Sequence, residues 1–119
     1  MNTITRNIYI TNSFNYDFSK AKKYFSGSGK FITITSGRIN IEKVKNLTIS
    51  ISSAIEDITI DDYLLLSGNI VVCSIVTALV FEKLGVLNLL IWDARKNCYF
   101  NRTVNHTDYI NIENHPQIK

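Results

Sequence analysis

The stretch DDYLLLSGNIVVCS, residues 61–74, decides the fold. Its first part, DYLLLSG (62–68), is an apolar run that ends in small residues, which is typical of a strand covered on both faces. Its second part begins the long apolar segment 69–84, and this apolar character predicts a buried helix. Gly85, which follows directly, is typical of the residue at which a helix ends. A strand that turns at once into a helix is characteristic of parallel α/β sheets. The junction therefore predicts an α/β fold.

The segments on either side continue the alternation of strands and helices. The expected strands are 7–13, 30–37, 62–68, 86–93 and 98–104, and the expected helices lie within 15–29, 40–58 and 69–84. This order predicts a small Rossmann-like three-layer domain, with a mostly parallel sheet and an antiparallel C-terminal edge strand at 98–104. The apolar segment 86–93 is expected to be buried on both faces. The strands that end at Thr35, Ser67 and Trp92 are expected to be central in the sheet.

Residues 40–58 allow two interpretations. Their apolar residues recur at spacings of three and four, which favours a helix capped by Asn40 with Glu42 in its first turn. The segment LTISIS within them, taken alone, favours a strand. We expect a helix because parallel strands on either side need a crossover connection.

Composition and charge indicate a single globular domain. Of the 119 residues, 45% are hydrophobic and 19% charged, which argues against disorder. The net charge of +3 is mild, so specific DNA binding is not expected. Residues 1–104 are assigned to the domain and 105–119 to a polar C-terminal tail. The N-terminus lacks the apolar core of a signal peptide and no apolar run could span a bilayer, so we expect no membrane association.

Cysteine and histidine are sparse and badly spaced for a metal site. Cys73 lies in the most apolar stretch, where a core role is expected, and Cys98 has no spacing partner for zinc. Both histidines, His106 and His115, fall in the polar tail. We therefore expect neither a metal nor a cofactor.

Polar residues gather at the predicted C-terminal ends of the strands, where ligands bind in parallel α/β sheets. Residues 67–69 predict an anion site, because the first amides of the next helix are unsatisfied and Gly68 would let the backbone approach a phosphate. Arg38 or Arg95 would bind the same phosphate, and Trp92 would stack on a base. The candidate ligand-binding residues are Asn12, Ser13, Ser36, Gly37, Arg38, Ser67, Gly68, Asn69, Trp92, Asp93 and Arg95.

A purely structural interpretation of this junction competes with the functional one. Gly68 would then form only a turn, and Asn69 would only cap the helix. Catalysis has little support, since no histidine lies near the predicted site and Ser67 has no evident general base. A pairing of Asp93 with Ser67 or Ser36 remains open, so the catalytic residues are unknown and enzyme activity stays undecided.

Two resemblances bear on function. DYLLLSGN with its apolar helix, GVLNLLIWDARKNCYFNRTV (85–104) and the opening IYITNSFNYDFSKAKKYF (8–25) resemble small proteins of unknown function from bacteriophages and archaeal viruses. The strand-Ser-Gly-Asn-helix junction within 62–84 resembles CRISPR-associated Rossmann-fold sensor and ring-nuclease domains. The second resemblance implies a dimer that binds a cyclic oligonucleotide.

Together these features lead us to expect a viral accessory protein, with a possible anti-defence role, that binds a nucleotide or another phosphate-containing signalling ligand in the host cytoplasm. A homodimer is expected because pairing would deepen a shallow site and cover an open strand edge. One alternative is an inhibitor of a host protein, which would use an exposed apolar patch such as Phe14, Tyr16 and Tyr24. Another is a small metal-independent ring nuclease. A concave basic pocket at the strand ends would favour nucleotide binding over inhibition of a host protein.

Overall fold

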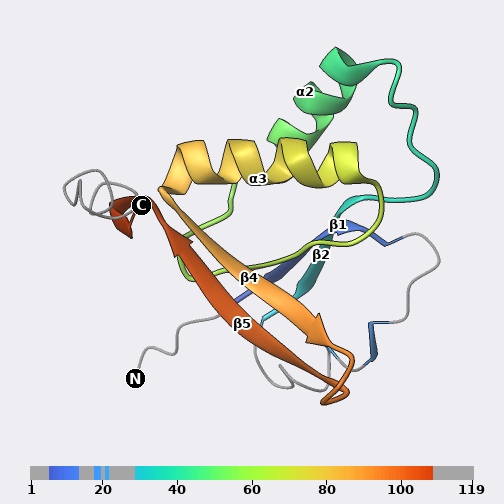
Figure 1. Ribbon diagram of the computed structural model, residues 1–119. Helices are drawn as coiled ribbons and strands as arrows, with labels where there is room; N and C mark the ends of the chain where they lie inside the picture. Colours follow the sequence, from blue (N-terminus) through green and yellow to red (C-terminus); the bar gives the residue numbers. More distant parts are fainter. Residues whose placement is uncertain (1–5, 14–17, 20, 22–28, 109–119) are drawn as a thin grey trace, which may run out of the picture.

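The computed structural model describes residues 6–13, 18–19, 21 and 29–108, and these contain one five-stranded sheet (Figure 1). The strands are β1 (Ile8–Asn12), β2 (Phe31–Thr35), β3 (Tyr63–Leu65), β4 (Val86–Asp93) and β5 (Cys98–Asn105). They lie in the order β2-β1-β3-β4-β5. β4 and β5 are antiparallel, and every other neighbouring pair is parallel. The predicted fold class, with its antiparallel C-terminal edge strand, is confirmed.

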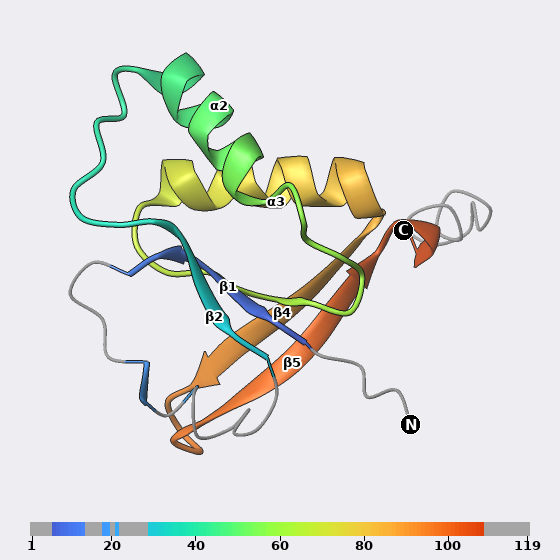
Figure 2. The same ribbon diagram turned by 180° about the vertical axis from the view of Figure 1, so that it is seen from behind.

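Two described helices cover one face of the sheet. Helices α2 (Val44–Ala54) and α3 (Ile70–Leu84) lie together on one face, as both views show (Figures 1 and 2). Phe18 and Ala21 pack on the other face against a cluster from β1, β3 and β4. The helix expected within 15–29 falls mostly outside the described residues, but Ser19 and Ala21 are helical. No helix in the described part of the chain is long and apolar enough to cross a membrane.

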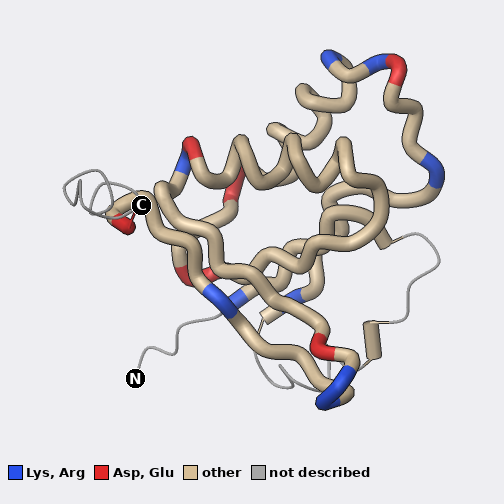
Figure 3. The backbone as a smooth tube through the Cα atoms, in the orientation of Figure 1, with Lys and Arg blue, Asp and Glu red and all other residues tan. Residues whose placement is uncertain are grey.

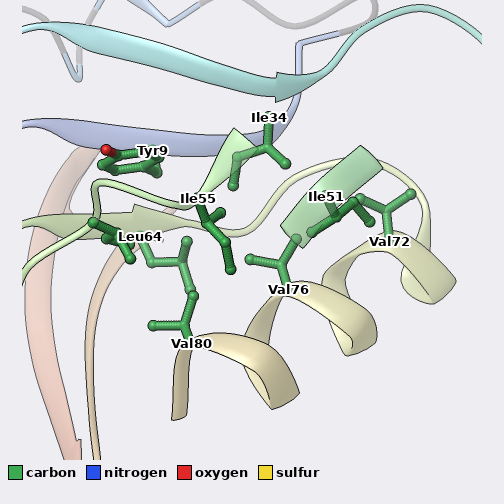
Figure 4. Close-up of a cluster of buried hydrophobic side chains, with 9 residues drawn as sticks. Tyr9, Ile34, Ile51, Ile55, Leu64, Val72, Val76 and Val80 are labelled. Atoms are coloured by element: carbon green, nitrogen blue, oxygen red, sulfur yellow. The ribbon is translucent and has the colours of Figure 1, made fainter. Parts of the chain in front are cut away.

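The core between the sheet and the two helices is built from aliphatic side chains and one tyrosine (Figure 4). Val72, Val76 and Val80 recur every four residues, so they form one stripe along α3 that faces the sheet. Burying each such side chain contributes roughly 1.5–3 kcal/mol. The labelled members of the cluster are Tyr9, Ile34, Ile51, Ile55, Leu64, Val72, Val76 and Val80.

The position of β2 differs from the prediction. The strand that ends at Thr35 is not central but forms one edge of the sheet, and β1 lies between it and β3. Every residue of β1 is buried, whereas Thr33 in the middle of β2 is exposed. The alternation of β-branched and threonine residues in β2 is thus the pattern of a strand with one open side. The strands that end near Ser67 and Trp92 are interior, as predicted.

β4 is less buried than its apolar sequence suggests. Leu90 is its only buried residue, so the prediction of a strand covered on both faces is wrong. The reason is geometrical: Leu65 at the end of β3 pairs with Leu90, and β4 continues to Asp93 beyond its neighbour. The long β4–β5 hairpin consequently projects past the rest of the sheet (Figure 1).

Helix boundaries agree with the prediction for α3 and differ for α2. Asn69 is the N-cap of α3 and Gly85 its C-cap, as expected. Residues 44–54 are helical, which settles the ambiguity of 40–58, but the N-cap is Lys43 and not Asn40. The side chain of Asn40 instead accepts a hydrogen bond from the backbone N–H of Glu42 at 3.0 Å, which places both residues in the turn before the helix.

Candidate functional site

Hydrogen bonds join the C-terminal ends of three strands around the β3–α3 junction. The hydroxyl of Thr11 donates to the carbonyl of Ser67 at 2.6 Å and accepts from the N–H of Ser67 at 2.7 Å. The hydroxyl of Ser67 in turn donates to the carbonyl of Asn12. The side-chain amide of Asn12 donates to the carbonyl of Gly37 at 3.1 Å. We call these four residues the strand-end network, and they fix the ends of β1, β2 and β3 relative to one another.

Gly68 is required by the packing of this junction. Its backbone has a φ of +84°, a conformation that residues with a side chain rarely adopt. A Cβ atom at this position would lie 2.8 Å from Cβ of Asn12. The positive φ agrees with the turn that the purely structural interpretation gave to Gly68, and the closeness of Asn12 adds a steric requirement that the sequence did not reveal.

Asn69 satisfies the first amides of α3 with its own side chain. Its Oδ1 atom accepts hydrogen bonds from the N–H of Val71 at 2.7 Å and from the N–H of Val72 at 3.3 Å. The N–H of Cys73 donates to the carbonyl of Asn69 at 3.0 Å. The amides of residues 71 and 72, on which a phosphate site would depend, are thus already paired within the protein.

A pocket of about 790 Å³ opens at the C-terminal end of β3 and beside the C-terminal half of β4. We call it the strand-end pocket. Its described lining is mostly aliphatic and aromatic, its polar side chains are those of Ser19, Ser67 and Cys73 with a contribution from Tyr99, and it includes no charged side chain. The described residues that line it are Phe18, Ser19, Leu65, Leu66, Ser67, Gly68, Cys73, Leu89, Leu90, Ile91, Trp92 and Tyr99.

An aromatic pair forms one wall of the strand-end pocket. Trp92 of β4 and Tyr99 of β5 lie directly opposite each other in the sheet. Their ring centroids are 5.1 Å apart with an interplanar angle of 61°, an edge-to-face arrangement. Trp92 keeps 40% of its surface exposed, so part of the indole is accessible to a ligand.

Two residues of this region were not among the site residues predicted from the sequence. Cys73 was expected in the core, but it is half-buried and lines the strand-end pocket, with its Sγ atom 3.4 Å from the Thr11 hydroxyl. Cys73 follows the Asn69 cap by one helical turn, and this spacing could have indicated that its side chain lies at the C-terminal edge of the sheet. Thr11, whose side chain is fully buried, resembles any other β-branched strand residue in the sequence.

The other candidate residues are divided between separate places. Ser13 donates its N–H to the carbonyl of Thr35 at 3.3 Å, so it joins β1 and β2. Ser36 and Arg38 are exposed in the loop before α2. Asp93 accepts hydrogen bonds from the N–H groups of Arg95 at 3.0 Å and Lys96 at 3.3 Å, which makes it the stabilising residue of the β4–β5 turn.

The β4–β5 turn lies well away from the β3–α3 junction in both views (Figures 1 and 2). The structure therefore gathers Asn12, Gly37 and residues 67–69, and it adds Trp92 through the shared pocket. Neither Arg38 nor Arg95 is among the described residues that line this pocket. Within the described ranges, no cluster of three or more histidine, cysteine or acidic residues could hold a metal ion.

Exposed hydrophobic residues also occur near the strand-end pocket. Leu66 and Trp92 are each 40% exposed at its lining, and Ile70 in the first turn of α3 is 80% exposed. The aromatic residues that the sequence suggested for an apolar patch, Phe14, Tyr16 and Tyr24, lie outside the described residues.

Comparison with known proteins identifies a viral family. The family described as Phage Pam3 gp32-like protein matches residues 5–106, which include all five strands and both α2 and α3. No curated protein and no solved structure gives a significant match. The resemblance to small phage proteins is thereby confirmed, whereas these comparisons do not show a relationship to CRISPR-associated Rossmann-fold domains. The chain belongs to the family of Phage Pam3 gp32-like proteins.

Proposed function

We propose that this phage protein binds a nucleotide in the strand-end pocket. The observation that carries the proposal is the pocket itself, with its place at the C-terminal end of β3 beside the parallel strand β4 and with its aromatic wall. Its volume of about 790 Å³ falls within the range of roughly 300–1,000 Å³ that is usual for small-molecule sites. Sites of this kind combine an apolar lining with a few placed polar groups, which here are supplied by Ser19, Ser67 and the backbone of Gly68.

The rigidity of the junction supports a binding role. The strand-end network fixes Ser67 through its N–H, its carbonyl and its hydroxyl. A site that is already ordered before the ligand arrives loses less conformational entropy on binding. One side of the strand-end pocket is therefore preorganised.

In a phage, such a protein would act as an accessory factor in the host cytoplasm, where capture of a signalling nucleotide would serve an anti-defence role. A homodimer fits this role because β5, eight residues long, is an edge strand of the described sheet, and an edge strand can pair with a second copy. Light scattering should then give twice the chain mass of 13.6 kDa. A monomer mass at high protein concentration would contradict the dimer and leave the ligand proposal standing.

Mass spectrometry of small molecules released from the purified protein tests the nucleotide proposal. Wild type should release a nucleotide or bind one from a panel of nucleotides, including cyclic oligonucleotides, in calorimetric titration. Trp92→Ala should lose this binding because it removes the aromatic wall of the pocket. Ile49→Ala is the matched control, since Ile49 is an exposed hydrophobic residue on α2 outside the pocket. Wild-type protein that releases and binds no member of the panel would refute the proposal.

A second candidate function is inhibition of a host protein by direct contact. The observation in its favour is the 80% exposure of Ile70, with Leu66 and Trp92 also exposed. Ile70 is not among the described pocket-lining residues, so Ile70→Asp should weaken a protein contact and leave nucleotide binding unchanged. Cross-linking in infected cells, compared between wild type and Ile70→Asp, separates the two functions.

A further inference from the structure

We infer that the strand-end pocket recognises the nucleobase of its ligand and leaves the phosphates outside, so that a nucleoside binds about as tightly as the corresponding nucleotide. This inference rests on the proposed function and states which part of the nucleotide the pocket holds. It reverses the expectation from sequence, in which the phosphate is the recognised group.

The absence of charge in the described lining is the first argument. Neither lysine nor arginine occurs among the described residues of the pocket wall. The chain from Tyr63 to Phe81, which supplies the β3–α3 side of the pocket, contains no charged residue at all. Figure 3 shows the same feature as an uncharged tube through α3 up to its C-terminal end. A phosphate buried against such a wall would lose its hydration without a cation to replace it.

The capping of α3 is the second argument. A helix N-terminus attracts a phosphate through amides that lack a partner. Here the amides of Val71 and Val72 bond to the side chain of Asn69. The side chain of Asn12 also occupies the space on one side of the turn, where a Cβ atom added at Gly68 would lie 2.8 Å from Cβ of Asn12. Both features remove what would otherwise favour a phosphate at this junction.

The aromatic wall is the third argument. A nucleobase is planar and neutral, and it binds well to an accessible aromatic face because stacking needs no charge. The indole of Trp92 is 40% exposed and packs edge-to-face with Tyr99, and it lines the same pocket as Ser67 and Gly68. The Ser67 hydroxyl donates its proton to the carbonyl of Asn12, so its oxygen remains as an acceptor for a donor on the edge of a base.

The chain contains a single tryptophan, Trp92, so its fluorescence reports on the strand-end pocket alone. The experiment titrates full-length protein with the four ribonucleosides and their 5′-monophosphates at low and at high salt, with inorganic phosphate as a further probe. We expect at least one nucleoside to quench Trp92 fluorescence. Its dissociation constant should lie within about threefold of that of its monophosphate, since a phosphate bound by a charge-assisted hydrogen bond would change it by more than about tenfold. Added salt should leave the affinity nearly unchanged.

Variants separate stacking from charge, with affinities measured by calorimetry. Trp92→Ala should weaken nucleoside binding by at least about tenfold, as expected for a lost stacking partner, while Trp92→Phe should retain most of it. Arg95→Ala and Ile49→Ala should match wild type. Circular dichroism confirms that each variant is folded. If Trp92→Ala does not fold, Trp92→Leu, which keeps an apolar side chain without a ring, takes its place and should show the same loss.

Two results would overturn the inference in different ways. Monophosphates that bind in a salt-sensitive manner, with nucleosides that do not bind, would refute base recognition and leave the proposed nucleotide site intact. A loss of affinity in Arg95→Ala equal to that in Trp92→Ala would do the same. Failure of every nucleoside and every nucleotide to bind would refute both the inference and the proposed function.

Discussion

The hydroxyl of Thr11 pairs with both backbone groups of Ser67, donating to its carbonyl at 2.6 Å and accepting from its N–H at 2.7 Å. These two residues are 56 positions apart in the chain. One buried side chain thus holds the turn between β3 and α3 against the end of β1. The shape of one side of the strand-end pocket depends on this contact.

Thr11→Val should destabilise the protein. Valine has nearly the same shape but lacks the hydroxyl, so both backbone groups of Ser67 lose this partner in a partly buried place. The free energy of unfolding should fall by about 1–3 kcal/mol, the usual effect of an unsatisfied buried group. Urea denaturation measures it. Thr11→Ser keeps the hydroxyl and should retain more stability than Thr11→Val, and the reverse order would contradict the role assigned to the hydroxyl.

Gly68→Ala should destabilise the fold more than Gly37→Ala. Both glycines have positive φ, at +84° and +71°, so each substitution carries a conformational cost of roughly 1–2 kcal/mol. Only at Gly68 would the new Cβ atom also clash, at 2.8 Å from Cβ of Asn12, whereas at Gly37 nothing lies within 4 Å. Denaturation midpoints of the two variants compare these costs directly. Equal midpoints would show that the junction can relax around a side chain. Substitution of Gly68 is for this reason a poor test of ligand binding.

Asn69→Ala should lower stability by about 1 kcal/mol, because it removes the side-chain acceptor from the first turn of α3. Asn69→Asp should retain the cap and gain from the helix dipole. Asn40→Ala is the matched control, since Asn40 accepts a single hydrogen bond in an exposed turn. Thermal unfolding of the three variants should place only Asn69→Ala clearly below wild type. A comparable loss in Asn40→Ala would mean that the helix-capping bonds of Asn69 stabilise the protein no more than the turn bond of Asn40.

Stability should fall at high pH through Tyr9. Burial raises the pKa of Tyr9 above its ordinary value of 10, and the negative charges of Asp62 and Asp57 raise it further. Tyr9 in the unfolded chain therefore loses its proton at a lower pH than Tyr9 in the folded protein. Its contribution to stability is complete below about pH 10 and is lost as the pH rises from there through the folded-state pKa. Urea denaturation between neutral and alkaline pH should show a shallower decline in Tyr9→Phe than in wild type, and parallel curves would contradict this assignment.

Much of the fold follows from local patterns in the sequence. The N-cap at Asn69, the C-cap at Gly85 and the antiparallel return of β5 depend on residues close together in the chain, and each is where the sequence indicates. The helical stripe in residues 44–54 also outweighs the strand-like LTISIS, because its apolar residues meet α3 and the sheet. The prediction that Asn40 caps the helix is wrong, because an asparagine side chain can accept a hydrogen bond from an N–H in its own turn as readily as from one in a helix.

The candidate site shows where sequence reasoning stops. The prediction that Asn12, Gly37 and Ser67 lie near one another is correct, because the ends of parallel strands meet at one edge of a sheet. Sequence reasoning also drew Asp93 and Arg95 to that point, although β4 continues past β3 and carries them into a separate turn. How far a strand extends beyond its neighbour depends on the register of the pairing, which no local pattern encodes.

The sequence by itself determined the order of the described strands and helices along the chain and both caps of α3, and it predicts the C-terminal edge of the parallel strands as the place where a ligand would bind. Only the tertiary structure decided that β2 lies at the edge, that Asn12 packs against the turn at Gly68, and that the described part of the pocket wall is aromatic and carries no charged side chain. The physical reason is the separation along the chain between the residues that interact. Helical periodicity and capping are set by residues within a few positions of one another. Strand order, the closeness of Asn12 to Gly68 and the presence of Trp92 and Ser67 in one pocket arise from packing between distant segments.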